Sequence, residues 1–144
     1  MIDAMRSLPA LLVAASALII FALGVLHLSI TFRGNRLHPR DASLLPALET
    51  VSPIITRETT MWKAWIGFNA SHSFGAMLFG LIYGYFALSA PALLFSSLFL
   101  RAVGLLLLGG YVWLGKRYWF RIPFRSIVLA TICYVLALVL AASG

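Results

Sequence analysis

Four apolar stretches, each long enough to cross a lipid bilayer, alternate with shorter polar or basic segments along the chain. A spanning helix needs about 20 mainly apolar residues. The stretches predict helices over residues 8–32, 57–88, 90–115 and 122–142. Short connections between consecutive helices favour antiparallel neighbours. We therefore expect residues 1–144 to form one all-α domain, an integral membrane four-helix bundle of antiparallel transmembrane helices.

Residues 33–61 form the one long connection in this pattern, and they mix charged residues with many leucines and isoleucines. Three prolines divide the segment, which is too apolar for a free linker. We expect it to lie on the cytoplasmic membrane surface as one or two short interfacial helices. Thr56 is the expected N-cap of the second spanning helix, and Ser89 is that of the third, where Pro91 falls in the first turn.

The composition is that of a membrane protein and excludes an ordinary soluble domain. Hydrophobic residues make up 62% of the chain and charged residues 10%, and the mean hydropathy is +0.98. The net charge of +7 does not indicate a nucleic-acid partner, because the basic residues flank apolar segments, where orientation and anionic lipid account for them. The single cysteine, Cys133, allows neither an intrachain disulfide nor a cysteine-rich metal site.

The distribution of lysine and arginine predicts the orientation in the membrane. These residues lie beside two connections, as Arg33, Arg36, Arg40, Arg57 and Lys63 at the first and Lys116, Arg117, Arg121 and Arg125 at the last. The opposite side has only Arg6. The positive-inside rule then places both connections in the cytoplasm and both termini outside. We expect the four cations of the last connection to contact anionic lipid headgroups.

Ionisable residues inside membrane spans are rare and are functional candidates by default. In the apolar parts of the spans they are His27, His72 and Arg101, whereas the four acidic residues lie outside these parts, with Glu58 in the first turn of the second predicted helix. The lack of intramembrane carboxylates in the sequence argues against a carboxylate-bridged di-iron enzyme and against an Asp/Glu proton relay. We expect Arg101 to lean toward the outer surface, as a lipid or anion contact.

Four polar residues in the cytoplasmic half of the predicted spans form the candidate binding site, namely His27, Asn69, His72 and Tyr134. At a rise of about 1.5 Å per residue, the two histidines and the tyrosine fall at similar depth. Helical side chains lean toward the N-terminus, which brings the two imidazoles closer in height, and Asn69 lies three residues before His72 on the same face. The alternative is that these groups form only interhelical hydrogen bonds that fix the packing.

The second predicted helix carries two series of small residues at four-residue spacing. They are Gly67, Ser71 and Gly75, followed by Ala76, Gly80 and Gly84. Small residues let membrane helices approach closely. The pattern leaves open whether the neighbouring helix belongs to this chain or to another protein.

Three short motifs fall between the first helix and the middle of the second, and together they cover about a third of the chain: HLSITF (27–32), HPRD (38–41) and WIGFNASHSFG (65–75). On these motifs the chain resembles a family of small, uncharacterised bacterial four-helix membrane proteins. That family has no assigned reaction, so the resemblance implies no catalytic residue. It implies that His27, Asn69, Ser71 and His72 belong to one site.

The sequence supports three functions of different classes. The first is an accessory or structural subunit that packs on a larger membrane protein complex through small-residue helix faces. The second is an intramembrane binding module, in which His27 and His72 ligate haem b or a chlorophyll-type pigment, or hydrogen-bond a quinone or lipid. No other metal is expected. The third is a membrane-embedded enzyme with His72 as acid or base, although no convincing nucleophile accompanies it.

Overall fold

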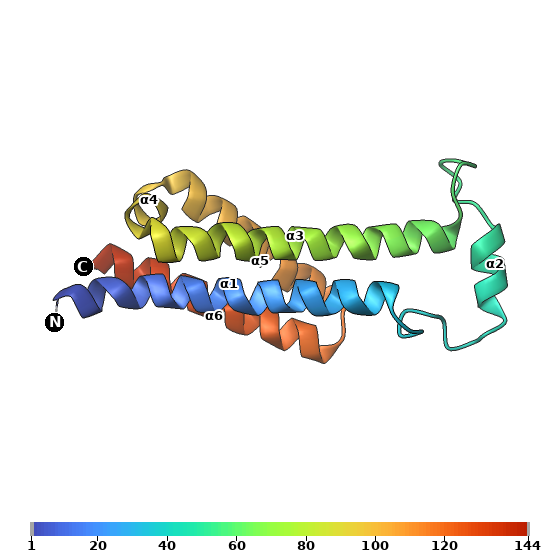
Figure 1. The fold of residues 1–144 in the computed structure, drawn as a ribbon, viewed down its shortest axis with the longest axis horizontal. Helices are drawn as coiled ribbons and strands as arrows, with labels where there is room; N and C mark the ends of the chain where they lie inside the picture. Colours follow the sequence, from blue (N-terminus) through green and yellow to red (C-terminus); the bar gives the residue numbers. More distant parts are fainter. Residues whose placement is uncertain (1, 144) are drawn as a thin grey trace. The chain divides into compact units, whose positions relative to one another are not determined.

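The computed structural model describes residues 2–143, with side chains described from residue 8 onward. Within this part of the chain there are six α-helices and no β-strand (Figure 1). The helices are α1 (Ile2–Phe32), α2 (Leu44–Thr50), α3 (Met61–Ser89), α4 (Pro91–Ser96), α5 (Leu98–Tyr118) and α6 (Arg121–Ser143). The prediction of an all-α protein is therefore confirmed.

Three of the described helices are long and apolar enough to cross a membrane. They are Leu8–Phe32 within α1, α5 and α6. This finding agrees with the prediction of a membrane protein. Helix α3 is not among them, although its 29 residues are long enough, because its glycines, tyrosines and polar residues lower its hydropathy. A fourth crossing by α3 stays a prediction.

The described chain divides into two compact units. The first unit combines residues up to 23 with those from 76 onward, and the second unit comprises residues 24–75. Helices α1 and α3 each contribute one part to each unit, so both helices run through the boundary.

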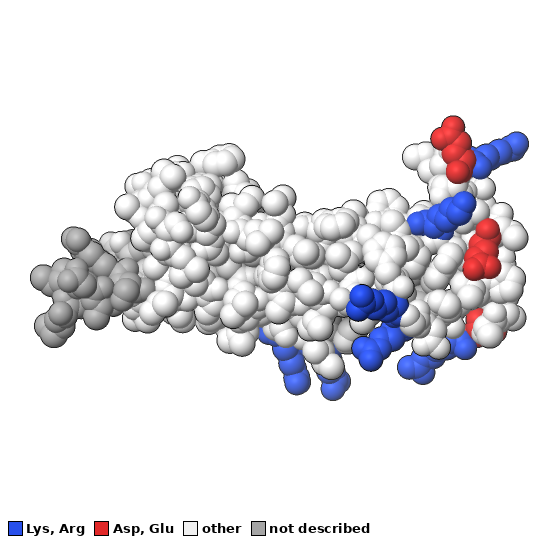
Figure 2. All heavy atoms as spheres, in the orientation of Figure 1, with Lys and Arg blue, Asp and Glu red and all other residues white. Residues whose placement is uncertain are grey.

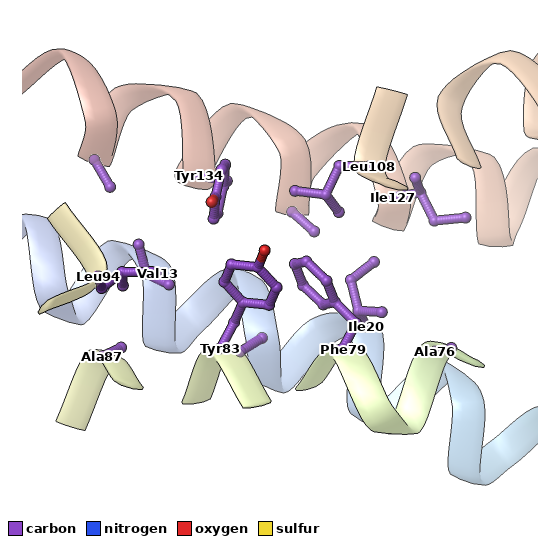
Figure 3. Close-up of a cluster of buried hydrophobic side chains, with 13 residues drawn as sticks. Val13, Ile20, Ala76, Phe79, Tyr83, Ala87, Leu94, Leu108, Ile127 and Tyr134 are labelled. Carbon is purple, nitrogen blue, oxygen red and sulfur yellow. The ribbon is translucent and has the colours of Figure 1, made fainter. Parts of the chain in front are cut away.

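The core of the first unit is built around two tyrosines on α3 and α6. Tyr83 and Tyr134 are buried and meet edge to face, with ring centroids 5.7 Å apart (Figure 3). The Tyr83 hydroxyl donates to the Leu100 carbonyl at 2.7 Å, and the Tyr134 hydroxyl lies 3.4 Å from the same oxygen. Gly104 lies one helical turn after Leu100, and its missing side chain leaves this carbonyl open to both hydroxyls.

Close packing of α1 and α3 in the first unit depends on glycine. A Cβ atom at Gly80 would lie 2.5 Å from the Cβ of Phe21 and 2.8 Å from the Ala17 carbonyl oxygen. A Cβ at Gly84 would lie 3.7 Å from the Cβ of Ala17, which is ordinary contact. The second series of small residues is therefore used inside the chain, as helix packing.

The sequence predicted one helix over residues 90–115, and the structure divides this segment at Ser97. Helix α4 ends at Ser96, and Ser97 adopts an extended conformation. Its side chain accepts a hydrogen bond from the N–H of Leu100 at 3.2 Å, which makes Ser97 the N-cap of α5. Ser89 is not a cap, because it is the last residue of α3, and Ala90 precedes Pro91 at the start of α4.

The second unit contains the end of α1, the loop with α2 and the first half of α3. Gly34 follows α1 with a φ of +79°, a left-handed conformation that suits glycine after a helix. Helix α3 begins at Met61 instead of residue 57, and Thr60 caps it by accepting from the N–H of Lys63 at 3.3 Å. The predicted cap, Thr56, instead accepts from the N–H of Glu58 inside the loop at 3.1 Å.

A short polar turn precedes α2. The hydroxyl of Ser43 donates to the Asp41 carboxylate at 2.6 Å, and the Ser43 N–H donates to the same oxygen at 2.9 Å. These two hydrogen bonds favour the ionised carboxylate and lower the pKa of Asp41 below its usual value. The turn therefore keeps its negative charge near neutral pH.

Candidate functional site

A hydrogen bond between helices α1 and α3 is the centre of the candidate site in the second unit. The Nε2 atom of His27 lies 3.0 Å from the Oδ1 atom of Asn69, which is 42 residues away in the sequence. Both side chains are partly buried. The structure thus brings together two of the residues that the sequence predicted as one site, through the interhelical contact that their depths suggested.

The orientation of the Asn69 amide follows from its second hydrogen bond. Its Nδ2 atom donates to the Trp65 carbonyl at 2.8 Å, one helical turn earlier on α3. The Oδ1 atom is therefore the acceptor that faces His27, and the Nε2 atom of His27 carries the proton. In its neutral form, His27 then has an acceptor lone pair on Nδ1.

The second histidine of the predicted site packs directly against the first. The rings of His27 and His72 meet edge to face, with centroids 5.5 Å apart and planes inclined by 84°. His72 is partly buried on α3, three residues after Asn69. His27, Asn69 and His72 therefore form one polar cluster, which we call the histidine cluster.

Two side-chain hydroxyl groups donate to backbone carbonyls of the histidine cluster. Thr31 donates its hydroxyl to the carbonyl of His27 at 2.7 Å, and Ser73 donates to the carbonyl of Asn69 at 2.9 Å. Both hydroxyls lie on the same helix as the carbonyl they contact, and both residues are buried. They satisfy polar groups inside a largely apolar helix pair, where an unpaired group is costly.

An aromatic layer joins the loop to the start of α3 in the same unit. His38 and Trp62 meet edge to face with ring centroids 5.0 Å apart, and the Trp65 indole donates to the Leu37 carbonyl at 3.3 Å. Neither contact was predicted, although His38 and Trp65 lie within the HPRD and WIGFNASHSFG motifs. The sequence signal for these contacts is the position of the tryptophans next to the loop, because the polar N–H of an indole ring usually finds a hydrogen-bond acceptor.

Tyr134, the fourth predicted site residue, belongs to the first unit. Its hydroxyl lies 3.4 Å from the carbonyl oxygens of both Leu100 and Arg101 on α5. Through these contacts the hydroxyl of Tyr134 faces backbone carbonyls in the core of the first unit. Tyr134 therefore contacts α5 within the first unit, and its place in the predicted binding site stays a prediction.

The cations predicted to contact lipid differ in their surroundings. Arg101 is partly buried, and its Nε atom is buried with no hydrogen-bond partner in the described part of the chain. The other four are exposed near the connection between α5 and α6, and they are Lys116, Arg117, Arg121 and Arg125. Exposure at this connection is compatible with headgroup contact, which stays a prediction.

The histidine cluster does not fit a haem held between two histidines. Such a haem needs a free ring nitrogen of each histidine directed at the iron from opposite faces, whereas these two rings pack directly against each other, edge to face. The Nε2 atom of His27 is also occupied by Asn69. Among the described residues, no group of three or more His, Cys, Asp or Glu side chains could hold a metal ion.

The serines beside His72 are bonded to their own helix. Ser71, which the family resemblance assigned to the site, is exposed and donates to the Phe68 carbonyl at 3.0 Å. Ser73 donates to the Asn69 carbonyl. Both hydroxyl protons are directed to carbonyl oxygens, so in this geometry neither serine can pass its proton to a base, as a nucleophile must.

Comparison of the chain with protein-family models, curated proteins and solved structures finds no match.

Proposed function

We propose that this chain is a four-span membrane subunit that packs against another membrane protein. Helix α3 would cross the bilayer together with the three helices that are apolar enough to span it. The histidine cluster then acts as an interhelical lock, because the amide and imidazole groups of Asn69 and His27 satisfy each other.

The observation that carries this proposal is a set of glycines with open surroundings. A Cβ atom added at Gly67, Gly109 or Gly110 would meet nothing within 4 Å, in contrast to Gly80 and Gly104. Gly67 begins the first series of small residues, and Ser71, one turn later, is exposed. Faces of this kind let a helix of another protein approach closely.

The exposure of the apolar helices supports the same proposal. Only 28%, 17% and 22% of the spanning windows of α1, α5 and α6 are buried within the chain. The remaining surface is available to lipid and to other membrane proteins. A subunit that completes its packing on a larger complex accounts for this surface together with the open glycines.

Native electrophoresis after mild detergent extraction tests the proposal. We expect a complex that contains a second protein, and cross-links from a cysteine placed at Ser71 in a Cys133→Ser background. A cysteine at Phe74, which is exposed at another position of α3, is the matched control and should cross-link less. Migration only as a free monomer or self-oligomer would contradict the accessory role.

The tautomer of His27 favours a second candidate function. In neutral His27, the Nδ1 lone pair could accept a hydrogen bond from a ligand hydroxyl, as in a quinol or a lipid headgroup. A ligand that offers only carbonyl oxygens would not suit this atom. At His27, this geometry therefore favours a ligand that donates a hydroxyl group.

Extraction of the purified protein and mass spectrometry test this second candidate. We expect a co-purified quinol or hydroxylated lipid that is lost in His27→Ala and kept in His38→Ala, a histidine of the same unit that packs on Trp62. Equal retention by both variants would assign the histidine cluster to packing alone.

A further inference from the structure

Two isoleucines occupy the tip of a tight turn in the second unit. The Thr56 N–H donates to the Pro53 carbonyl at 3.2 Å, which closes a turn with Ile54 and Ile55 at its two central positions. The exposed fractions of these side chains are 109% and 91%. Turn centres usually carry glycine, proline or small polar residues, so two fully exposed aliphatic side chains are unusual there.

Hydrogen bonds at the base and beside the tip hold this turn in place. The N–H of Met61 donates to the Val51 carbonyl at 2.8 Å, which joins the two ends of the excursion. The hydroxyl oxygen of Thr56 accepts from the N–H of Glu58, directly after the isoleucines. These hydrogen bonds hold the loop in shape, and the exposed isoleucine side chains add no packing to it.

The surroundings of the turn favour a lipid surface as the partner. The spanning segment of α1 ends at Phe32, so the loop that follows lies at the level where the chain leaves the bilayer. Charged side chains of both signs surround α2 and the turn (Figure 2). In residues 24–75 the five cations exceed the three carboxylates, which suits an anionic headgroup layer.

We propose that Ile54 and Ile55 form a wedge that inserts into the interfacial layer of an anionic membrane, beside the helices of the second unit. The turn projects to the side of the first turn of α3 and away from α2 (Figure 1). Insertion would remove from water two apolar side chains that the protein itself leaves uncovered. Arg57, exposed directly after the turn, would meet the phosphates of the same leaflet.

The wedge is tested by fluorescence in vesicles of phosphatidylcholine and phosphatidylglycerol. The full-length protein carries Cys133→Ser and a single cysteine at Ile55, labelled with an environment-sensitive dye. The matched control has the cysteine at Glu49, an exposed position on α2. We expect several-fold stronger quenching at position 55 by a lipid nitroxide near the headgroup, and several-fold weaker quenching by aqueous iodide.

Two outcomes would overturn the wedge. Iodide quenching at position 55 as strong as that of the free dye in the same vesicle suspension would show that the turn stays in water. Shielding in native membranes that is absent in vesicles of the purified protein would show that another protein covers the isoleucines. A cysteine at Ile54 provides a second labelled variant, and an unchanged elution profile of each labelled protein shows that it is folded. The accessory role proposed above does not depend on either result.

Discussion

At the scale of single residues, the described glycines of α5 divide into those that permit a contact and those that face open space. Gly104 lies against the phenols of Tyr134 and Tyr83, whereas nothing lies within 4 Å of a Cβ added at Gly109 or Gly110. The first position allows two buried hydroxyls to reach a helix carbonyl. The same residue type therefore serves internal packing at one site and leaves a surface open at the others.

Gly104→Ala should destabilise the protein because the added methyl group would overlap the Tyr134 ring. Overpacking of this kind typically costs about 1–3 kcal/mol of unfolding free energy. Thermal unfolding in mild detergent measures the effect. Gly109→Ala is the control, and it should be neutral or slightly stabilising because alanine is the better helix former. Equal stability of the two variants would contradict the packing described around Gly104.

The hydrogen bond between His27 and Asn69 should appear as an energetic coupling. A double-mutant cycle of His27→Ala and Asn69→Ala should give about 0.6 kcal/mol, and at most about 1.7 kcal/mol, as for interhelical hydrogen bonds in other membrane proteins. Unfolding in mixed detergent micelles measures it. The control cycle combines His27→Ala with Ser71→Ala, whose hydroxyl contacts only its own helix, and it should be additive. Additivity in both cycles would contradict the proposed interhelical lock between His27 and Asn69.

At the scale of helices, the ends are set by side chains that compete for backbone groups. The sequence contains Thr56 and Thr60 at similar distances from the apolar run, and only Thr60 accepts from an N–H of α3. Which threonine caps the helix depends on the path of the loop. The hydrogen bond from the Met61 N–H to the Val51 carbonyl fixes this path. Apolar periodicity predicts that a helix exists, whereas such long-range loop contacts decide where it begins.

Ser97→Ala should weaken the start of α5. Loss of the hydrogen bond from the Leu100 N–H to this N-cap costs about 0.5–2 kcal/mol in other helices. Ser96→Ala is the matched control, because the neighbouring hydroxyl only donates back to the Leu93 carbonyl. Equilibrium unfolding of both variants measures the difference. If the control were equally destabilised, the break at Ser97 would not depend on capping.

The candidate site shows how far sequence reasoning reaches at this scale. Depth along a helix follows from residue counting, which places His27 and His72 at similar depth, and in the structure their rings are in contact. Depth does not give the direction in which a side chain points around the helix axis. Tyr134 has a similar predicted depth, but its hydroxyl is used by carbonyls of α5. The break at Ser97 was also unforeseen, because no glycine or proline marks that position.

At the scale of the whole molecule, the number of crossings decides on which side the C-terminus lies. Three helices are apolar enough to span by composition, and α3 is long enough but carries Asn69 and His72. Four crossings place both termini on one side, whereas three place them on opposite sides. If α3 did not cross, the connection after α5, with its four basic residues, would lie outside and would break the positive-inside rule.

Reporter fusions at two positions test the fourth crossing. We expect a fusion after Ser43, in the loop, to be active only as a cytoplasmic reporter. A fusion after Ser89, at the end of α3, should be active only outside, because a crossing of α3 carries the chain through the bilayer. The same fusion at Gly144 should also report the outside. Cytoplasmic activity at both Ser89 and Gly144 would mean that α3 does not span, since α5 and α6 together return the chain to the side from which they start.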